Sequence, residues 1–174
     1  MNKCLAWSMM VCAIAGFCAM PAANAATSSK NLIANPAGVC QLSIPTIDSK
    51  VRPKATAYNN EGTTTVFVIC GLTNPASLDG GSSLVFLGAR SLDGATHNLT
   101  CTAVNGIAGL SGQLYVSKTL TVPAAGFGEI DWAPADFGGS TTIPDSRSMS
   151  VTCTLPPNVG INAVGQQYLL EIGS

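Results

Sequence analysis

The stretch "SMSVTCTLPPNVGI", from Ser148 to Ile161, decides the fold. Its apolar residues Met149, Val151, Cys153 and Leu155 alternate with Ser and Thr until two prolines end the pattern. Alternation with a period of two is typical of a β-strand that buries one face. Cys153 therefore points inward, and its thiol is a catalytic group, a metal ligand or half of a disulfide.

Similar short patterns recur along the chain, in "TTVFVICGL" (64–72), "NLTCTAVNG" (98–106), "LYVSKTLTVP" (114–123) and "QYLLEIGS" (167–174). Segments rich in Gly, Pro and Asn separate them, and Asp93-Gly94 is a hairpin signal. No window sustains a helical period. The sequence predicts an all-β protein, an antiparallel, jelly-roll-like β-sandwich of seven to nine short strands with two disulfides and no long helix. The last strand, at 167–173, is the expected exposed edge.

The N-terminus has the pattern of an export signal. Lys3 is followed by an apolar run and then by the small-residue site Ala23-Asn24-Ala25, which together are typical of a cleaved secretory signal peptide. We expect a signal peptide at 1–25, a flexible lead-in at 26–37 and a single β-sandwich domain at 38–174. The protein is then secreted or periplasmic, without a membrane span in its mature chain.

Cysteine usage agrees with export. The chain has seven cysteines, and cleavage after Ala25 leaves an even set of four: Cys40, Cys70, Cys101 and Cys153. An even set in an exported chain indicates two disulfides, and four cysteines allow three pairings. Ties between neighbouring strands of one sheet favour Cys40–Cys70 with Cys101–Cys153.

The residues that support common enzyme chemistries are scarce. His97 is the only histidine, so a metal site rich in histidine or a serine triad is not expected. A Cys101/His97 pair is conceivable, but a cysteine on the inward face of a strand is a poor nucleophile. The near-neutral net charge of −1 provides no footprint for nucleic acid. We therefore predict no catalytic residue, no cofactor and no metal, although the oxygen-rich loop around Asp136 leaves calcium as a minor alternative.

The segment "DWAPADF", 131–137, is the candidate ligand site. Trp132 and Phe137, if exposed, would stack on a sugar ring, and Asp131 and Asp136 would accept hydrogen bonds from its hydroxyl groups. The competing interpretation places Trp132 in the core between the sheets.

The order "VFVICGL", "LTCTAV", "SVTCTLPPNVGI" and terminal "YLLEIG" resembles a group of small exported bacterial proteins of unknown function. These have paired cysteines and a Ser/Thr-Cys-Thr/Ser-Leu-Pro segment near the C-terminus. The resemblance covers about residues 38–173 and implies a compact secreted sandwich of jelly-roll type. It implies no catalytic residue.

The leading functional hypothesis is a non-catalytic exported β-sandwich that binds a glycan of the cell envelope. One alternative is a structural or adhesive surface subunit that associates with envelope protein through a sheet edge such as 167–173. A distant alternative is a hydrolase that uses the carboxylates of Glu129 or Asp131.

Overall fold

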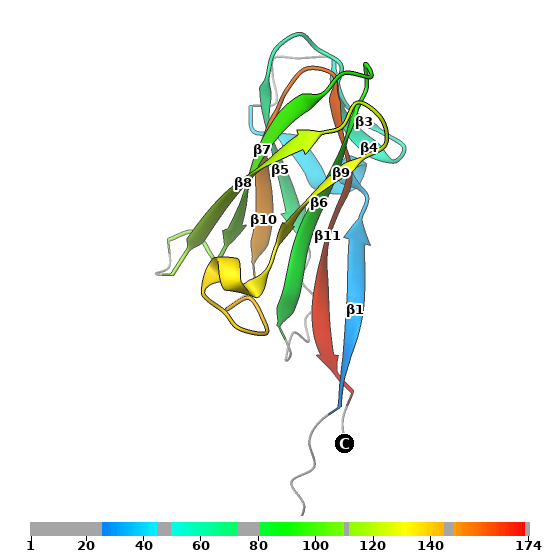
Figure 1. The fold of residues 1–174 in the computed structure, drawn as a ribbon. Helices are drawn as coiled ribbons and strands as arrows, with labels where there is room; N and C mark the ends of the chain where they lie inside the picture. The colour runs from blue at the N-terminus through cyan, green and yellow to red at the C-terminus, as the bar shows by residue number, and fades with distance from the viewer. Residues whose placement is uncertain (1–25, 45–49, 73–80, 110–111, 145–147, 173–174) are drawn as a thin grey trace, which may run out of the picture.

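The computed structural model describes residues 26–44, 50–72, 81–109, 112–144 and 148–172. Within these ranges the chain forms two antiparallel sheets that pack face to face, which confirms the predicted β-sandwich (Figure 1). The helical elements are single short turns. The elements are β1 (Thr27–Ala34), α1 (Pro36–Val39), β2 (Cys40–Leu42), β3 (Val51–Lys54), β4 (Ala57–Asn60), β5 (Val66–Leu72), β6 (Ser82–Ser91), β7 (His97–Asn105), β8 (Leu114–Val122), β9 (Gly128–Trp132), the 3₁₀ turn η1 (Pro134–Phe137), β10 (Met149–Leu155) and β11 (Val159–Glu171).

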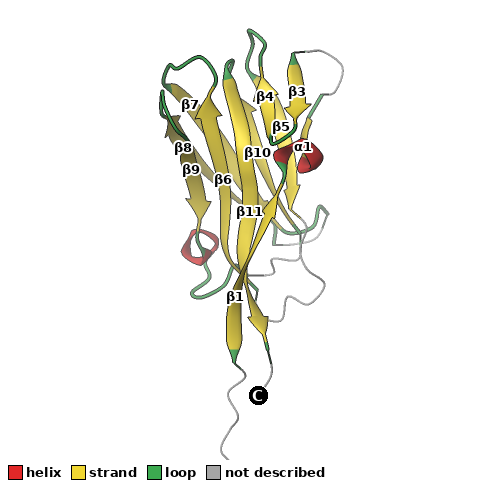
Figure 2. Ribbon diagram, turned by 90° about the vertical axis from the view of Figure 1, so that its right-hand side faces the viewer, coloured by secondary structure: helices red, strands yellow, loops and turns green. Residues whose placement is uncertain are grey.

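The first layer is a six-stranded sheet in the order β3-β4-β11-β6-β9, with β1 also paired to β11. Strand β11 is its long central member. One side of β11 pairs with β6, and the other side is shared between β4, opposite Val159–Ile161, and β1, opposite 164–171. Figure 2 shows β1 lying against β11. The sheet therefore has three outer strands: β1, β3 and β9.

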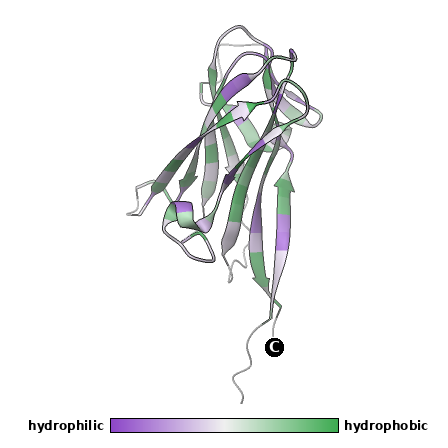
Figure 3. Cartoon of the chain, in the orientation of Figure 1, coloured by the Kyte–Doolittle hydropathy of each residue, from purple (hydrophilic) through white to green (hydrophobic). Residues whose placement is uncertain are grey.

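The second layer is a five-stranded sheet in the order β2-β5-β10-β7-β8. Strand β10, which carries the deciding sequence, lies between β5 and β7. Its residues alternate between buried and partly exposed along the whole strand, as predicted. Figure 3 shows that hydrophobic residues alternate with more polar ones along much of the sandwich.

The core lies between the two sheets and consists mainly of aliphatic side chains from alternate strand positions. Leu87 and Val85 of β6 face Leu99 of β7 and Val151 of β10 in this layer, and all four are fully buried. Burying one such side chain contributes roughly 1.5–3 kcal/mol. The strand faces that point away from the core are left free for solvent or a ligand.

Both disulfides lie within the five-stranded sheet and have the pairing favoured by the sequence. Cys40 of β2 is bonded to Cys70 of β5, and Cys101 of β7 is bonded to Cys153 of β10. Each pair also consists of directly opposed residues in the strand register. The bridges therefore join neighbouring strands, and the two sheets are held together by packing and hydrogen bonds.

Two expectations about the ends of the domain are wrong. Residues 27–34, predicted as part of a flexible lead-in at 26–37, form strand β1, and Pro36 begins α1. The strand predicted as an exposed edge at 167–173 is paired with β1 over 167–171, and Gln167 and Tyr168 are also paired with β6 on the other side. The predicted edge is occupied by the segment that was expected to be unstructured.

The proposed signal peptide, residues 1–25, lies outside the described residues. Among the residues that are described, no helix is long and apolar enough to cross a membrane.

Candidate functional site

The four residues of the predicted ligand site do not form a glycan platform. Trp132 is 0% exposed and Phe137 is 5% exposed, so neither ring can stack on a sugar, and the expected stacking is wrong. The physical reason is the alternation along β9. Trp132 lies two residues after the buried Ile130 and shares its inward face.

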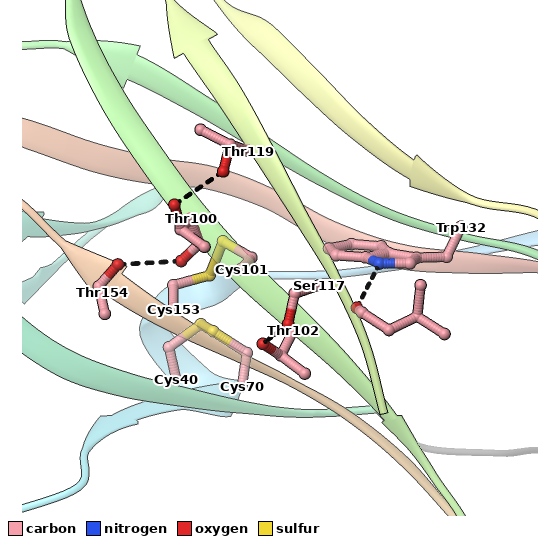
Figure 4. The surroundings of a disulfide bond; sticks show 11 residues. Cys40, Cys70, Thr100, Cys101, Thr102, Ser117, Thr119, Trp132, Cys153 and Thr154 are labelled. Carbon is pink, nitrogen blue, oxygen red and sulfur yellow. Dashed lines mark hydrogen bonds between the residues drawn. A yellow bond between two sulfur atoms is a disulfide. The ribbon is translucent and has the colours of Figure 1, made fainter. Parts of the chain in front are cut away.

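The indole of Trp132 is part of the core between the two sheets. Its Nε1–H donates to the backbone oxygen of Val116 in β8 at 2.9 Å (Figure 4). Lys118 makes a second connection there, donating from Nζ to the backbone oxygen of Asp131 at 2.8 Å. This side of the sandwich is therefore joined across β8 and β9, and Trp132 has a structural role.

Asp136 is engaged in local structure. Its Oδ2 accepts from Lys118 Nζ at 2.7 Å and from the backbone N–H of Ala133 at 2.8 Å. Burial raises the pKa of Asp136, but the hydrogen bonds from Lys118 and Ala133 outweigh it and the net pKa is lowered. These two hydrogen bonds to Oδ2 fix the start of η1, so Asp136 has a structural role.

Asp131 is exposed but lies apart from the buried aromatics, because it alternates with Ile130 and Trp132 along β9. It shares the outer face of the six-stranded sheet with Glu129. Burial, then the charge of Asp131 and a hydrogen bond with it, raise the pKa of Glu129. Two carboxylates on an exposed sheet face interact with each other, but no described cavity connects them, and this arrangement does not advance the hydrolase alternative.

The Cys101/His97 pair is wrong as a nucleophile and base. Cys101 is consumed in its disulfide, and His97 Nε2 lies 2.8 Å from Asp93 Oδ1 in the β6–β7 turn. Hydrogen bonds from His97, then Ala95 and Ser91, hold the pKa of Asp93 well below its usual range. This network orders the turn. Among the described residues, no group of three His, Cys, Asp or Glu side chains could hold a metal ion.

The most distinctive polar surface lies on the outer face of the five-stranded sheet. Leu99, Cys101 and Ala103 of β7 are fully buried, so Thr100 and Thr102 between them point outward. The same logic turns outward Thr152 and Thr154 of β10, and Ser117 and Thr119 of β8. We call these six residues, Thr100, Thr102, Ser117, Thr119, Thr152 and Thr154, the hydroxyl face.

The strand register arranges the hydroxyl face in two rows. Thr154, Thr100 and Thr119 lie side by side across β10, β7 and β8, and Thr152, Thr102 and Ser117 form the adjacent row. Neighbouring strands are about 4.8 Å apart, and alternate residues along a strand are about 7 Å apart. The result is a regular grid of hydroxyl groups, and the Cys101–Cys153 disulfide lies beneath it on the inward side of β7 and β10.

Hydrogen bonds within the grid leave capacity for a ligand. Thr100 Oγ1 lies 2.9 Å from Thr119 Oγ1, and Thr102 Oγ1 lies 2.7 Å from Ser117 Oγ (Figure 4). A hydroxyl has one proton and two lone pairs. Each such pair uses one proton and one lone pair, so it keeps one donor and several acceptor positions facing outward. Thr154 Oγ1 donates to the backbone oxygen of Thr100 at 3.2 Å and retains its own lone pairs.

Two exposed aromatic rings flank the grid. Tyr115 of β8 is 62% exposed and Phe67 of β5 is 58% exposed. Tyr115 lies opposite Val104 and Phe67 lies opposite Thr154, which places them at diagonally opposed corners. Three strand spacings and four residues along a strand separate them by about 20 Å. None of the described outward positions on β5, β7, β8 and β10 carries a charge.

A separate groove of about 560 Å³ opens where α1 and β2 face β3 and β4. Ala37, Leu42, Val51, Pro53 and Tyr58 contribute most of its apolar lining. Burial raises the pKa of Tyr58, partly offset by a hydrogen bond with the Leu42 backbone, so the phenol is neutral at physiological pH. The lining of the groove is mixed, because Gln41 and Ser43 join these apolar side chains, and it lacks the regular rows of hydroxyl groups that form the hydroxyl face.

Sequence reasoning missed the hydroxyl face. Its signal is the Thr-x-Thr pattern of "LTCTAV", "SVTCTL" and "SKTLT", in which the polar positions alternate with the buried ones. What the pattern lacks is the order of the strands, which brings the three segments side by side.

Comparisons with known proteins show a distant structural likeness. No family model and no curated protein matches the sequence. Among solved structures, that of TmCBM61 in complex with β-1,4-galactotriose is similar at a TM-score of 0.36 and 9% identity, over 81% of this chain and 88% of that one. The assignment of a ligand below rests on the face itself.

Proposed function

We propose that the protein is a non-catalytic module that binds a neutral polysaccharide of the cell envelope through the hydroxyl face. The observation that carries this proposal is the uncharged grid of hydroxyl groups between the exposed rings of Tyr115 and Phe67. Sugars present hydroxyl groups that both donate and accept, together with apolar C–H faces. The grid matches the first and the aromatic rings match the second.

The absence of charge on these outward positions argues for a neutral ligand. An anionic polymer would gain no ion pair there, whereas the opposite face of the sandwich carries Arg52, Lys54, Arg90, Glu129 and Asp131. The separation of the aromatic rings, about 20 Å, suits several consecutive sugar units better than a single one. A polymer that crosses the strands diagonally would contact both rings and the grid between them.

Export supports the same proposal. Disulfides form and persist in oxidising compartments, and the sequence at 1–25 has the pattern of a signal peptide. Placement in the periplasm or outside the cell would bring the hydroxyl face to envelope polysaccharides.

The test is retention on insoluble polysaccharides. The oxidised chain 26–174 is mixed with peptidoglycan and with neutral and anionic surface polysaccharides, beside the variants Tyr115→Ala, Phe67→Ala and Phe127→Ala. Phe127 is the matched control because it is 64% exposed but lies in the loop before β9. We expect retention on a neutral polymer that weakens about tenfold, or about 1.4 kcal/mol, in the Tyr115 and Phe67 variants only. No retention, or equal loss in the Phe127 variant, would contradict the proposal.

A second variant tests the hydroxyl groups themselves. Thr100→Val with Thr102→Val keeps the side-chain shape and removes two donors from the grid. The matched control, Thr96→Val, removes a hydroxyl from the exposed β6–β7 turn. Weaker retention in the first variant and unchanged retention in the second are expected. If all variants bind like the native protein, the ligand lies elsewhere.

A further inference from the structure

Strand β1 is attached to the molecule through one neighbour. It pairs with β11 over eight consecutive residues, from Thr27 opposite Glu171 to Ala34 opposite Val164. None of its residues belongs to the buried core, and Ile33 is 65% exposed. Its attachment therefore rests mainly on backbone hydrogen bonds. In Figures 1 and 2, β1 and the end of β11 extend together beyond the rest of the sandwich.

The connection from β1 to the rest of the fold is one residue long. β1 ends at Ala34, and Pro36 begins α1. Between them, Asn35 accepts from the N–H of Ala37 at 3.0 Å and donates to the backbone oxygen of Ala55 at 2.8 Å. The Cys40–Cys70 disulfide then fixes the chain to the five-stranded sheet. Everything from Cys40 onward is thus anchored independently of β1.

The surface of β11 that receives β1 is shaped for this particular strand. A Cβ atom on Gly165 would lie 2.6 Å from the backbone oxygen of Leu32 in β1 and would also meet the ring of Phe86 in β6, so glycine permits the close approach of both. In addition, Gln167 Nε2 donates to Asn31 Oδ1 at 3.1 Å. The glycine permits the close approach of a strand, and the side-chain hydrogen bond with Asn31 favours this strand in this register. The partner that fits them is another β1.

We propose that β1 exchanges between copies of this chain, so that β1 of one molecule occupies the β11 edge of a second. All strand contacts in the exchanged form are those of the closed monomer, which makes such exchange a low-cost route to association. A short hinge favours it, because a single residue restricts how β1 can fold back. An edge of β11 left without β1 exposes a row of unpaired backbone groups, which is a template for strand addition. Reciprocal exchange gives a closed dimer, and head-to-tail exchange gives a chain of molecules.

Cysteine cross-linking between two differently labelled chains tests the proposal. Asn31→Cys is placed in one chain and Gln167→Cys in a second chain that carries a mass tag. The two residues are register partners whose side chains already touch. The chains are mixed at high concentration and oxidised gently. We expect a tagged heterodimer, at least tenfold more abundant than the one formed when Phe127→Cys replaces Gln167→Cys.

Two further variants make the result decisive. A single chain with both Asn31→Cys and Gln167→Cys, oxidised when dilute, should form the internal bond and then fail to exchange with tagged chains. Gly165→Val in the tagged chain should abolish the heterodimer, because the side chain would displace the incoming strand. Buried Trp132 fluorescence reports whether each variant is folded. Heterodimer yields equal to those of the Phe127→Cys control, with folded proteins, would overturn the proposal. The outcome is independent of polysaccharide retention.

Discussion

Removal of the Cys101–Cys153 bridge is predicted to bring the domain close to its unfolding threshold. The bonded residues are 52 positions apart, against 30 for Cys40–Cys70. In the chain-entropy description, closing loops of these lengths restricts the unfolded chain by about 4.1 and about 3.6 kcal/mol. Cys101 and Cys153 are almost completely buried, so the double variant Cys101→Ala with Cys153→Ala also loses core packing, by about 1 kcal/mol.

The expected loss for this variant is therefore about 5 kcal/mol, out of a total of about 5–15 kcal/mol for a typical domain. With a urea m-value of about 2 kcal/mol per molar, the midpoint should fall by about 2.5 M. The assay is equilibrium unfolding in urea, followed by Trp132 fluorescence and by circular dichroism so that two-state behaviour is checked.

The matched variant, Cys40→Ala with Cys70→Ala, should lose a similar amount, because its loop is only moderately shorter. The native fluorescence spectrum should be unchanged in both variants without urea, since the entropic effect acts on the unfolded chain. A midpoint shift below about 0.5 M for the Cys101–Cys153 variant would refute the reasoning. It would mean that the sheet contacts already restrict the reduced chain as strongly as the bridge does.

The remaining predictions concern the residues around β9. Trp132→Ala should lower the free energy of unfolding by about 3–5 kcal/mol, measured by urea unfolding followed by circular dichroism. Under conditions in which the variant is folded, its retention on polysaccharide should be unchanged. Because the Lys118 and Ala133 hydrogen bonds lower the folded pKa of Asp136, its contribution is present at neutral pH and is lost as the pH falls through that pKa. Asp136→Asn should therefore make the melting temperature fall less steeply as the pH is lowered. Burial raises the folded pKa of Glu129, so its effect on stability has the opposite pH dependence. The ionised carboxylate destabilises the folded state at neutral pH, and this destabilisation disappears when the carboxyl group is protonated at low pH. Glu129→Gln should raise the melting temperature at pH 7 more than at pH 3; an equal rise at both would contradict the assigned cause.

The inward faces of the strands could be predicted from the sequence because burial imposes the alternation directly. Met149, Val151, Cys153 and Leu155 are all buried, and the disulfide pairs follow from neighbouring strands. The same rule could have placed Trp132, since Ile130 two residues earlier has the same orientation. The Pro-containing segment that follows Trp132 is typical of an exposed loop, and this local signal competes with the alternation.

Strand β1 could not be predicted by the same rule. Its sequence, "TSSKNLIA", has no buried face to impose a pattern, and its pairing partner is more than 130 residues away in the chain. Residues 27–34 form a strand because they pair with the open side of β11, and the position of that open side cannot be derived from the sequence pattern. The hydroxyl face was hidden for a related reason, because the order β10-β7-β8 is a property of the fold.

The arrangement of β1 and β11 also determines how the molecule would respond to pulling. Thr27 and Glu171 are register partners at the start of β1 and the end of β11, and the β6–β7 turn lies at the other end of β11, where Ser91 is paired with Val159. A load applied between Thr27 and Glu171 acts across the strands and opens their hydrogen bonds one at a time. A load between Thr27 and the distant turn runs along the strands, so that all the bonds of β1 must yield together. The mechanical strength of the protein therefore depends on its points of attachment, and the same eight-residue strand is weak in one direction and strong in the other.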